Sequence, residues 1–217
     1  MRVRVKICGL RTAEAVAAAV RCGADALGFV FSLSPRRIAV PDARALAAEI
    51  PPFVARVAVL WNPDAQGVLR VCESFGPDVV QCEPDRHGAA PHLGRAAFLA
   101  VLHDGPDVAV HAHALPAGGA VLLDSAGQGG RGVAPDWRRA AAIARTRPLV
   151  LAGGLTPENV GGAIRTVCPY AVDVSSGVES SPGVKDPALI ERFIEAVRRA
   201  GDATDGGGVT WSSVLGC

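Results

Sequence analysis

The chain has 217 residues, of which 49% are hydrophobic and 20% charged, a composition typical of a globular protein with one large domain or two small ones. Its formal net charge of +1 gives no electrostatic argument for a nucleic-acid partner or an anionic membrane surface. No apolar run approaches the roughly 18 residues that span a bilayer, and the N-terminus starts directly with a strand pattern, so we expect a protein of the cytoplasm.

Short apolar strands alternate with longer, alanine-rich amphipathic segments along the chain. In chain order the sequence predicts strand 3–7, helix 12–22, strand 25–31, helix 41–49, strand 53–60, helix 63–74, strand 77–82, helix 88–95, strand 97–102, helix 106–114, strand 119–124, helix 135–145, strand 148–153, helix 156–167, strand 170–175 and helix 186–199. Residues 201–217 are glycine-rich and without periodicity. They are predicted to form an extension, for which disorder is one option, beyond a domain of residues 1–200.

Eight strand–helix units in about 200 residues are the number found in a single-domain (β/α)8 barrel, although the alternation would also fit a doubly wound open sheet. The glycine-rich segments distinguish the two folds. A dinucleotide-binding sheet has its glycine-rich loop after the first strand, whereas here such segments follow the last three strands, at 125–132, 152–159 and 175–183. Barrels bind phosphate at the loops after strands seven and eight, so the sequence favours the barrel.

The loops after the seventh and eighth predicted strands are candidates for this phosphate site. Gly153 and Gly154 follow one strand, and Ser175, Ser176 and Gly177 follow the other. Small residues let backbone N–H groups approach an anion without obstruction, although ordinary tight turns need glycine as well. Because two such loops are adjacent, we expect them to bind a phosphate.

Polar residues end other strands, at the rim where barrels carry out their chemistry. Strand alternation places Lys6 and Cys8 on the inner face of the first strand. A buried ammonium needs a partner, which we expect to be Asp173 because the eighth strand closes against the first. Cys8 then lies at the rim, opposite Asp124, where Lys6 and Arg36 are positioned to lower the pKa of its thiol. An acid and a base facing each other over an anchored ligand are typical of a proton-transfer isomerase, but from the residues alone a packed core thiol is the favoured explanation of Cys8.

The cysteines and histidines give no sign of a metal centre. The six cysteines are scattered and include no Cys-x-x-Cys pair, which favours reduced thiols over a disulfide framework or a zinc site. His111 and His113 are two residues apart, so a helix would carry them on different faces. We therefore predict no metal.

Five segments resemble the phosphoribosylanthranilate isomerases of tryptophan biosynthesis, a family of (β/α)8 barrels. They run in order over residues 2–186 and read VKICGLRT, GADALGFVFSLSPRRI, LLDS with GGRG, LAGGLTPENV and AVDVSSGVESSPGVKD. The resemblance implies an aldose–ketose (Amadori) rearrangement of N-(5-phosphoribosyl)anthranilate to 1-(2-carboxyphenylamino)-1-deoxyribulose 5-phosphate, without a cofactor. We accordingly expect a small phosphosugar substrate, no nucleic-acid or membrane partner, and a monomer or homodimer.

The resemblance also implies roles for single residues. The family's motif cysteine falls on Cys8, as general base, and its sixth-strand aspartate on Asp124, as general acid. Arg36 would help to hold the anthranilate part while Arg37 faces solvent, with the opposite assignment of the two arginines as the alternative. Asp173 is a further expected substrate contact, and the two glycine-rich loops would bind the phosphate.

Two loops depart from the family pattern. After strand four the family reads V-Q-L-H-G, whereas this chain keeps Gln81, the third expected substrate contact, but has Glu83-Pro84 in place of His-Gly. In the sixth loop Arg131 and Pro135 are substitutions. Neither change touches the acid or the base, but both concern ligand contacts.

Three alternatives have less support. A related isomerase of histidine biosynthesis performs the same rearrangement with an aspartate where this chain has Cys8. A phosphosugar-binding barrel without catalysis is supported only by the two altered loops. A Schiff-base aldolase would use Lys6, which lies one inward layer below the rim and would need a lowered pKa.

Overall fold

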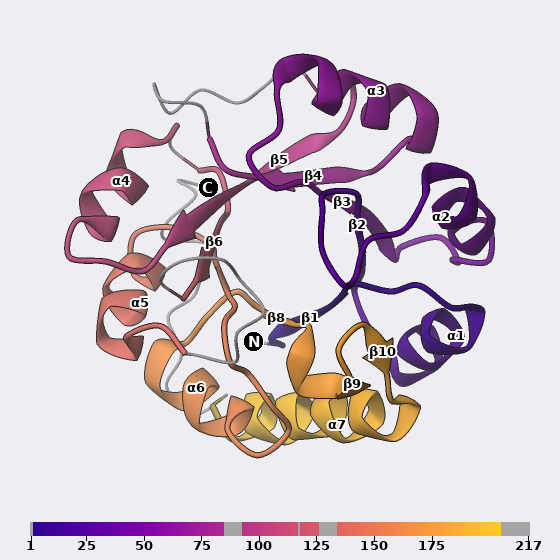
Figure 1. Ribbon diagram of the computed structural model, residues 1–217. Coiled ribbons are helices and arrows are strands. Elements are labelled where there is room, and N and C mark those ends of the chain that lie inside the picture. Colours follow the sequence, from indigo (N-terminus) through magenta and orange to yellow (C-terminus); the bar gives the residue numbers. More distant parts are fainter. Residues whose placement is uncertain (1, 85–92, 117, 126–133, 205–217) are drawn as a thin grey trace.

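The computed structural model of the chain describes residues 2–84, 93–116, 118–125 and 134–204. Eight parallel strands close into a barrel in chain order, and the helices form a ring around it (Figure 1). The strands are β1 (Arg4–Cys8), β2 (Ala26–Val30), β3 (Ala55–Val59), β4 (Val79–Cys82), β5 (Ala97–His103), β6 (Val121–Asp124), β7 (Leu149–Leu151) and β8 (Ala171–Val174). A small antiparallel hairpin, β9 (Glu179–Ser181) with β10 (Val184–Lys185), follows β8. The predicted barrel is confirmed, because β8 pairs with β1 and leaves no open edge.

The described helices are α1 (Ala13–Cys22), α2 (Val40–Ala47), α3 (Ala65–Phe75), α4 (Val108–Ala114), α5 (Trp137–Ala144), α6 (Val160–Val167) and α7 (Pro187–Thr204), with a 3₁₀ turn η1 (Ser176–Val178). Capping side chains begin several of them: Thr12 accepts a hydrogen bond from the Ala15 N–H, and Asp64 accepts one from the Gly67 N–H. The first part of the predicted helix 88–95 lies outside the described residues, and the described 93–95 form a turn instead. The division at residue 200 stays a prediction, because α7 runs on to Thr204 and the tail beyond it is outside the described residues.

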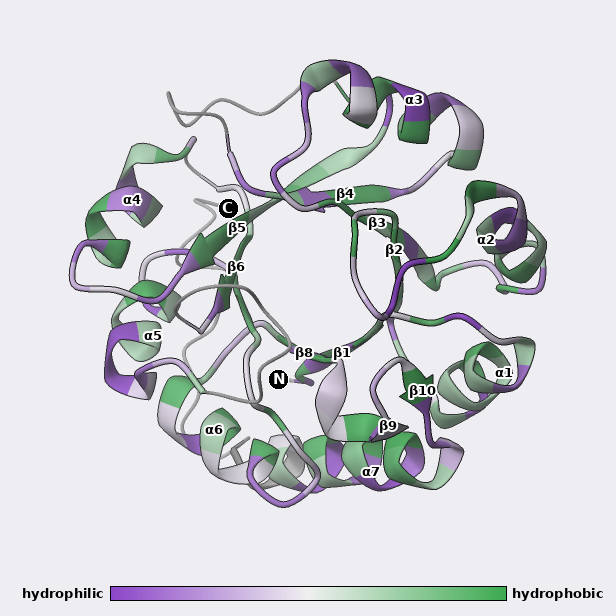
Figure 2. Cartoon of the chain, viewed as in Figure 1, coloured by the Kyte–Doolittle hydropathy of each residue, from purple (hydrophilic) through white to green (hydrophobic). Residues whose placement is uncertain are grey.

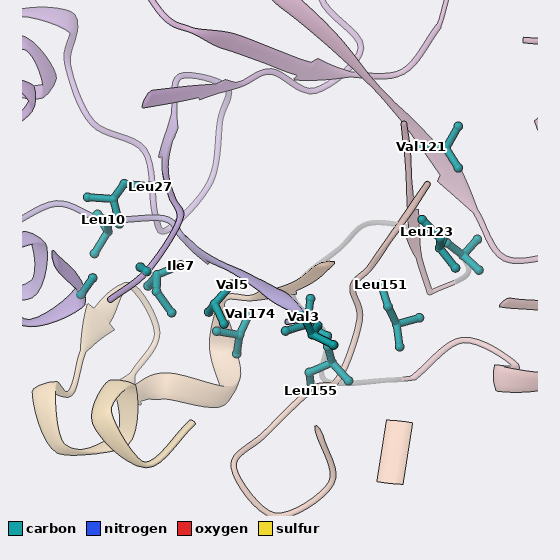
Figure 3. Close-up of a cluster of buried hydrophobic side chains, with 14 of the residues drawn as sticks. Val3, Val5, Ile7, Leu10, Leu27, Val121, Leu123, Leu151, Leu155 and Val174 are labelled. Atoms are coloured by element: carbon teal, nitrogen blue, oxygen red, sulfur yellow. The ribbon is translucent and has the colours of Figure 1, made fainter. Parts of the chain in front are cut away.

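Strand alternation divides the apolar side chains between two layers. Outward-facing residues such as Val5, Ile7 and Leu27 are buried between the barrel and the helices (Figure 3). A smaller cluster, which includes Val101 and Leu122, fills the barrel interior. The strands are mostly hydrophobic, while the helices carry hydrophobic and hydrophilic residues in turn (Figure 2). Each buried large aliphatic side chain contributes about 1.5–3 kcal/mol relative to exposure, so both layers stabilise the closed barrel.

A buried ion pair joins the first and last strands of the barrel. Lys6 and Asp173 are register partners on β1 and β8, and the Lys6 Nζ donates to Asp173 Oδ1 at 2.9 Å. Both side chains are almost inaccessible, at 5% and 8% exposure. Burial acts to lower the pKa of Lys6, but the charge and hydrogen bond of Asp173, with the Cys8 thiol, raise it above its ordinary value. The predicted pairing is confirmed.

Asp173→Ala should destabilise the protein by about 3–5 kcal/mol, because it leaves the Lys6 ammonium buried without its carboxylate. The free energy of unfolding, measured by urea titration at neutral pH, checks this. Glu158→Ala is the matched control, since it breaks the exposed ion pair with Arg192 and should change stability little. Equal stability of the two variants would contradict a structural role for the buried pair.

Candidate active site

A cavity of about 210 Å³ opens at the carboxyl ends of the barrel strands. Its floor and rim come from strand ends on both sides of the barrel, and its mouth from the loops after β2, β3 and β4. The described lining residues are Cys8, Val30, Ser32, Leu33, Ser34, Pro35, Arg36, Val59, Leu60, Trp61, Gln81, Glu83, Val101, Asp124, Asp173 and Ser175. The structure thus brings together six of the predicted site residues, while the predicted phosphate residues Gly153, Gly154, Ser176 and Gly177 lie outside this lining.

Cys8 ends β1 with its thiol on the inner face of the barrel. Gly9 follows with a φ of 80°, so the chain turns away immediately above the cysteine. On the neighbouring strand, a Cβ at Gly28 would stand 3.0 Å from the Cys8 Sγ and 3.1 Å from the Lys6 Nζ. The Ser175 hydroxyl donates to the Cys8 carbonyl oxygen at 3.2 Å. Glycine at position 28 therefore leaves the space that the thiol and the ammonium occupy.

The predicted lowering of the Cys8 pKa is wrong. Burial, the largest effect, raises the pKa of this thiol above its ordinary value, and it outweighs the opposing charges of Lys6 and Lys185. The Asp173 carboxylate raises it further. Arg36 is not placed as expected, since its guanidinium is paired with Glu179. Cys8 is consequently protonated in most molecules at neutral pH.

Asp124 ends β6 on the same inner face, and its carboxylate accepts a hydrogen bond from the Ser125 N–H at 2.7 Å. Burial raises the pKa of Asp124, although the Ser125 hydrogen bond opposes the shift. The Asp173 charge also raises it, and the His103 charge lowers it. A raised pKa is the direction that a general acid requires.

Arg36 belongs to a charged network that joins the β2 loop to the hairpin after β8. Its Nε and Nη2 donate to the two carboxylate oxygens of Glu179, each at 2.8 Å. The buried Lys185 Nζ donates to the same carboxylate at 2.7 Å and to the Ser175 carbonyl oxygen at 2.9 Å. Arg37 is exposed, as predicted. Glu179 and Lys185 were not predicted as site residues, although both lie in the segment AVDVSSGVESSPGVKD.

Glu83 forms a second ion pair, at the place where the fourth loop departs from the family pattern. Its Oε1 is 3.3 Å from the His103 Nε2, and its Oε2 accepts the Asn62 N–H at 2.9 Å. The Trp61 ring packs against the His103 ring, with the centroids 5.4 Å apart and the planes tilted by 45°. The hydrogen bond to Glu83 raises the pKa of His103, against the effect of burial. His103 was not predicted as a site residue.

The loops after β7 and β8 touch each other, as predicted. A Cβ at Gly177 would stand only 1.9 Å from the Leu155 carbonyl oxygen, so glycine is required where η1 meets the β7 loop. The Asn159 side chain donates to the Gly154 carbonyl oxygen at 2.8 Å and holds this loop in shape. The two loops therefore form one continuous backbone surface.

Several backbone N–H groups on this surface have no described acceptor. Those of Gly153, Gly154, Ser176 and Gly177 donate no hydrogen bond to any residue that the structure describes. Gly153 and Gly154 have φ values of 83° and 58°, which glycine adopts without strain. Free N–H groups from two adjacent loops are what an anion needs.

No group of three or more His, Cys, Asp or Glu residues within the described ranges is arranged to hold a metal ion. Within the same part of the chain, none of the helices is both long and apolar enough to cross a membrane.

A comparison with known protein families shows what this chain is similar to. The family model described as N-(5'phosphoribosyl)anthranilate (PRA) isomerase matches residues 5–196. The chain belongs to this family. The resemblance expected from the sequence motifs is confirmed.

Individual phosphoribosylanthranilate isomerases are similar over almost their whole length. The Pseudomonas fluorescens N-(5'-phosphoribosyl)anthranilate isomerase is 41% identical, over 93% of this chain and 98% of its own. A crystal structure of a phosphoribosyl anthranilate isomerase in complex with reduced 1-(o-carboxyphenylamino)-1-deoxyribulose 5-phosphate is 36% identical, with a TM-score of 0.76, over 91% and 99% of the two chains. A structure of monomers generated from the dimeric Thermotoga maritima enzyme is 35% identical, with a TM-score of 0.74, over 90% and 98%.

The phosphoribosylanthranilate isomerases catalyse a step of tryptophan biosynthesis, and the chain is an enzyme of this activity. The expected reaction class and the expected barrel are confirmed together. The roles of single side chains in the reaction are inferred from the geometry of the cavity.

Proposed function

We propose that the cavity binds N-(5-phosphoribosyl)anthranilate with its phosphate on the loops after β7 and β8 and its aromatic ring toward the β2 and β3 loops. The free N–H groups of the two glycine-rich loops support the phosphate end. Leu33 and Trp61, exposed at 93% and 39%, support the aromatic end, because both line the mouth of the cavity. Arg36 lines the cavity as well, and its network with Lys185 has two cations for the one Glu179 carboxylate, which leaves positive charge for the anthranilate carboxylate.

Two buried polar groups support contacts to the sugar between these ends. The Oε1 of Gln81 is buried in the cavity wall and has no hydrogen-bond partner among the described residues. It is therefore available to a hydroxyl or amine of the substrate. Asp173 lines the cavity while it is paired with Lys6, so it meets the substrate as a fixed carboxylate.

The reaction then follows from an acid and a base at opposite sides of one cavity, and this is the observation that carries the proposal. Protonated Asp124 gives its proton to the furanose ring oxygen, and the ring opens to a Schiff base. The Cys8 thiolate removes the proton on C2, and the resulting enolamine tautomerises to the 1-deoxyribulose product. No other redox partner is needed, because C1 is reduced as C2 is oxidised.

Turnover tests the proposal through the loss of fluorescence of freshly prepared N-(5-phosphoribosyl)anthranilate. The histidine-pathway substrate, offered alongside, tests whether this chain also acts on the related carboxamide. The dimeric Thermotoga maritima relative makes a homodimer the first assembly to test, against a monomer, by light scattering. We infer a cytoplasmic enzyme from the scattered cysteines.

The pKa directions predict the order in which the acid and the base titrate. Burial raises both pKa values. The pKa of Asp124 starts from the ordinary range of a carboxyl group and that of Cys8 from the higher range of a thiol, so Asp124 titrates first. The productive form, with a thiolate and a neutral carboxyl, is then a minor species at every pH. Its fraction is constant between the two pKa values. At pH values below the pKa of Asp124 this fraction decreases, because the thiolate is protonated. At pH values above the pKa of Cys8 it decreases, because the carboxyl group is deprotonated.

We therefore expect kcat/KM to form a bell with a broad plateau, whose acidic limb belongs to Asp124 and whose alkaline limb belongs to Cys8. The ultraviolet absorbance of the thiolate, taken as the difference between wild type and Cys8→Ser, identifies the limbs. It should appear along the alkaline limb. Appearance of the Cys8 thiolate along the acidic limb would mean that the thiol titrates before the acid, contrary to this order.

A further inference from the structure

Glu83 places a carboxylate in the wall of a cavity that has to accept an anionic substrate. It lines the cavity beside Trp61, on the side where the proposed function puts the anthranilate ring. The anthranilate carries its own carboxylate, and like charges brought together without a cation between them weaken binding. A compensating positive charge is therefore needed beside Glu83.

His103, on the next strand, supplies the positive charge that compensates Glu83. It is the last residue of β5, on the inner face of the barrel, and is register-paired with Asp124. Its Nε2 lies 3.3 Å from Glu83, and both side chains are largely shielded, at 30% and 22% exposure. Among the described residues, the charged groups that face it are Glu83 from the β4 end and Asp124 from the β6 end. Its chain neighbour Asp104 is bound by Arg139 at 2.8 Å.

Glu83 is thereby fixed as well as neutralised. Its second oxygen accepts the Asn62 N–H, and the Trp61 ring packs at a tilt against the imidazole. The carboxylate therefore has little freedom to turn away from the cavity if the imidazole is removed. Its negative charge would then remain in the wall beside the bound anthranilate.

We propose that His103 is a positioning residue for substrate binding: as an imidazolium it cancels the charge of Glu83 and lets the anthranilate carboxylate approach this wall. The proposal rests on the proposed placement of the aromatic end of the substrate. His103 acts through Glu83 and takes no proton from the substrate. Its effect should therefore appear in KM, with a smaller effect on kcat.

Three variants test this: His103→Gln, Glu83→Gln and the double variant. His103→Gln leaves Glu83 charged and should raise KM on the order of tenfold, the effect of one uncompensated like-charge contact. The double variant has neither charge and should recover most of the wild-type KM. A merely structural role of His103 would not be rescued by a second substitution in the same contact. Thermal unfolding of all three variants shows whether they remain folded.

A pair of product analogues locates the interaction on the substrate. His103→Gln should weaken binding of reduced 1-(o-carboxyphenylamino)-1-deoxyribulose 5-phosphate, but not of the analogue with a plain phenyl ring. In the wild type, KM should rise as pH increases through the raised pKa of His103, because the neutral imidazole no longer cancels Glu83. In Glu83→Gln this rise should move to lower pH, because the carboxylate that raises the pKa of His103 is gone.

Two results would overturn the proposal. An unchanged KM in His103→Gln would make Glu83 only an anchor for the Asn62 loop. Failure of the double variant to recover KM would mean that His103 contacts the substrate itself. Failure of the proposed acid–base pair is recognised separately, by wild-type-like kcat after substitution of Cys8 or Asp124.

Discussion

Cys8→Ala should lower kcat by about 10²- to 10⁴-fold, the usual contribution of a positioned general base, while KM stays within a few-fold of wild type. The thiol is the group left to act as a base on its side of the cavity floor, since the carboxylate of Asp173 is held by Lys6. Among the described residues that line the cavity, no unpaired carboxylate lies beside the thiol to replace it. Steady-state fluorescence gives kcat and KM, and binding of the reduced product analogue checks that the site is intact.

A second buried cysteine provides the matched control. Cys82 ends β4 with its side chain in the outer core, fully buried, and burial raises the pKa of its thiol to about 12. Cys82→Ala removes the same atom from a packed position, so it should lower stability and leave kcat nearly unchanged. If Cys8 were only a packed thiol, the two variants would behave alike. Turnover of Cys8→Ala within a few-fold of wild type would remove Cys8 from the mechanism.

The barrel could be predicted because each strand carries its pattern locally. The alternation of β1 shows that Lys6 faces the barrel interior. Because a closed barrel places β8 beside β1, the sequence also predicts the pairing of Lys6 with Asp173. The start of α6 was predicted too early, at 156 instead of Val160. Thr156 and Asn159 have good helix-start chemistry, but the Asn159 side chain accepts from the Thr156 N–H and shapes the loop instead.

The missed site residues depend on contacts between distant segments. Glu179 meets Arg36 across 143 positions of sequence, by way of a hairpin of short strands that has no strong periodic signal. His103 was overlooked because the fifth strand was predicted to end one residue earlier, although the alternation of β5 would have turned it inward. The pKa of Cys8 was predicted in the wrong direction for another reason. Neighbouring charges can be inferred from sequence, but the extent of burial that outweighs them cannot.

Asp124→Asn should also lower kcat by about 10²- to 10⁴-fold, because an amide of the same size cannot transfer a proton to the ring oxygen. Asp104→Asn is the control: it makes the same chemical change at the neighbouring rim, where the carboxylate binds Arg139 and does not line the cavity. It should cost stability and leave kcat nearly unchanged.

The step blocked by Asp124→Asn differs from the step blocked by Cys8→Ala, and this makes the two assignments separable. Without the base the ring still opens, so Cys8→Ala should accumulate the Schiff base, which cyanoborohydride reduces to a stable secondary amine. Without the acid the ring stays closed, so Asp124→Asn should give no more reduced amine than substrate without enzyme. Equal trapping in the two variants would contradict the division of roles. Trapping in Asp124→Asn alone would reverse it, since ring opening would then depend on Cys8 and proton removal on Asp124.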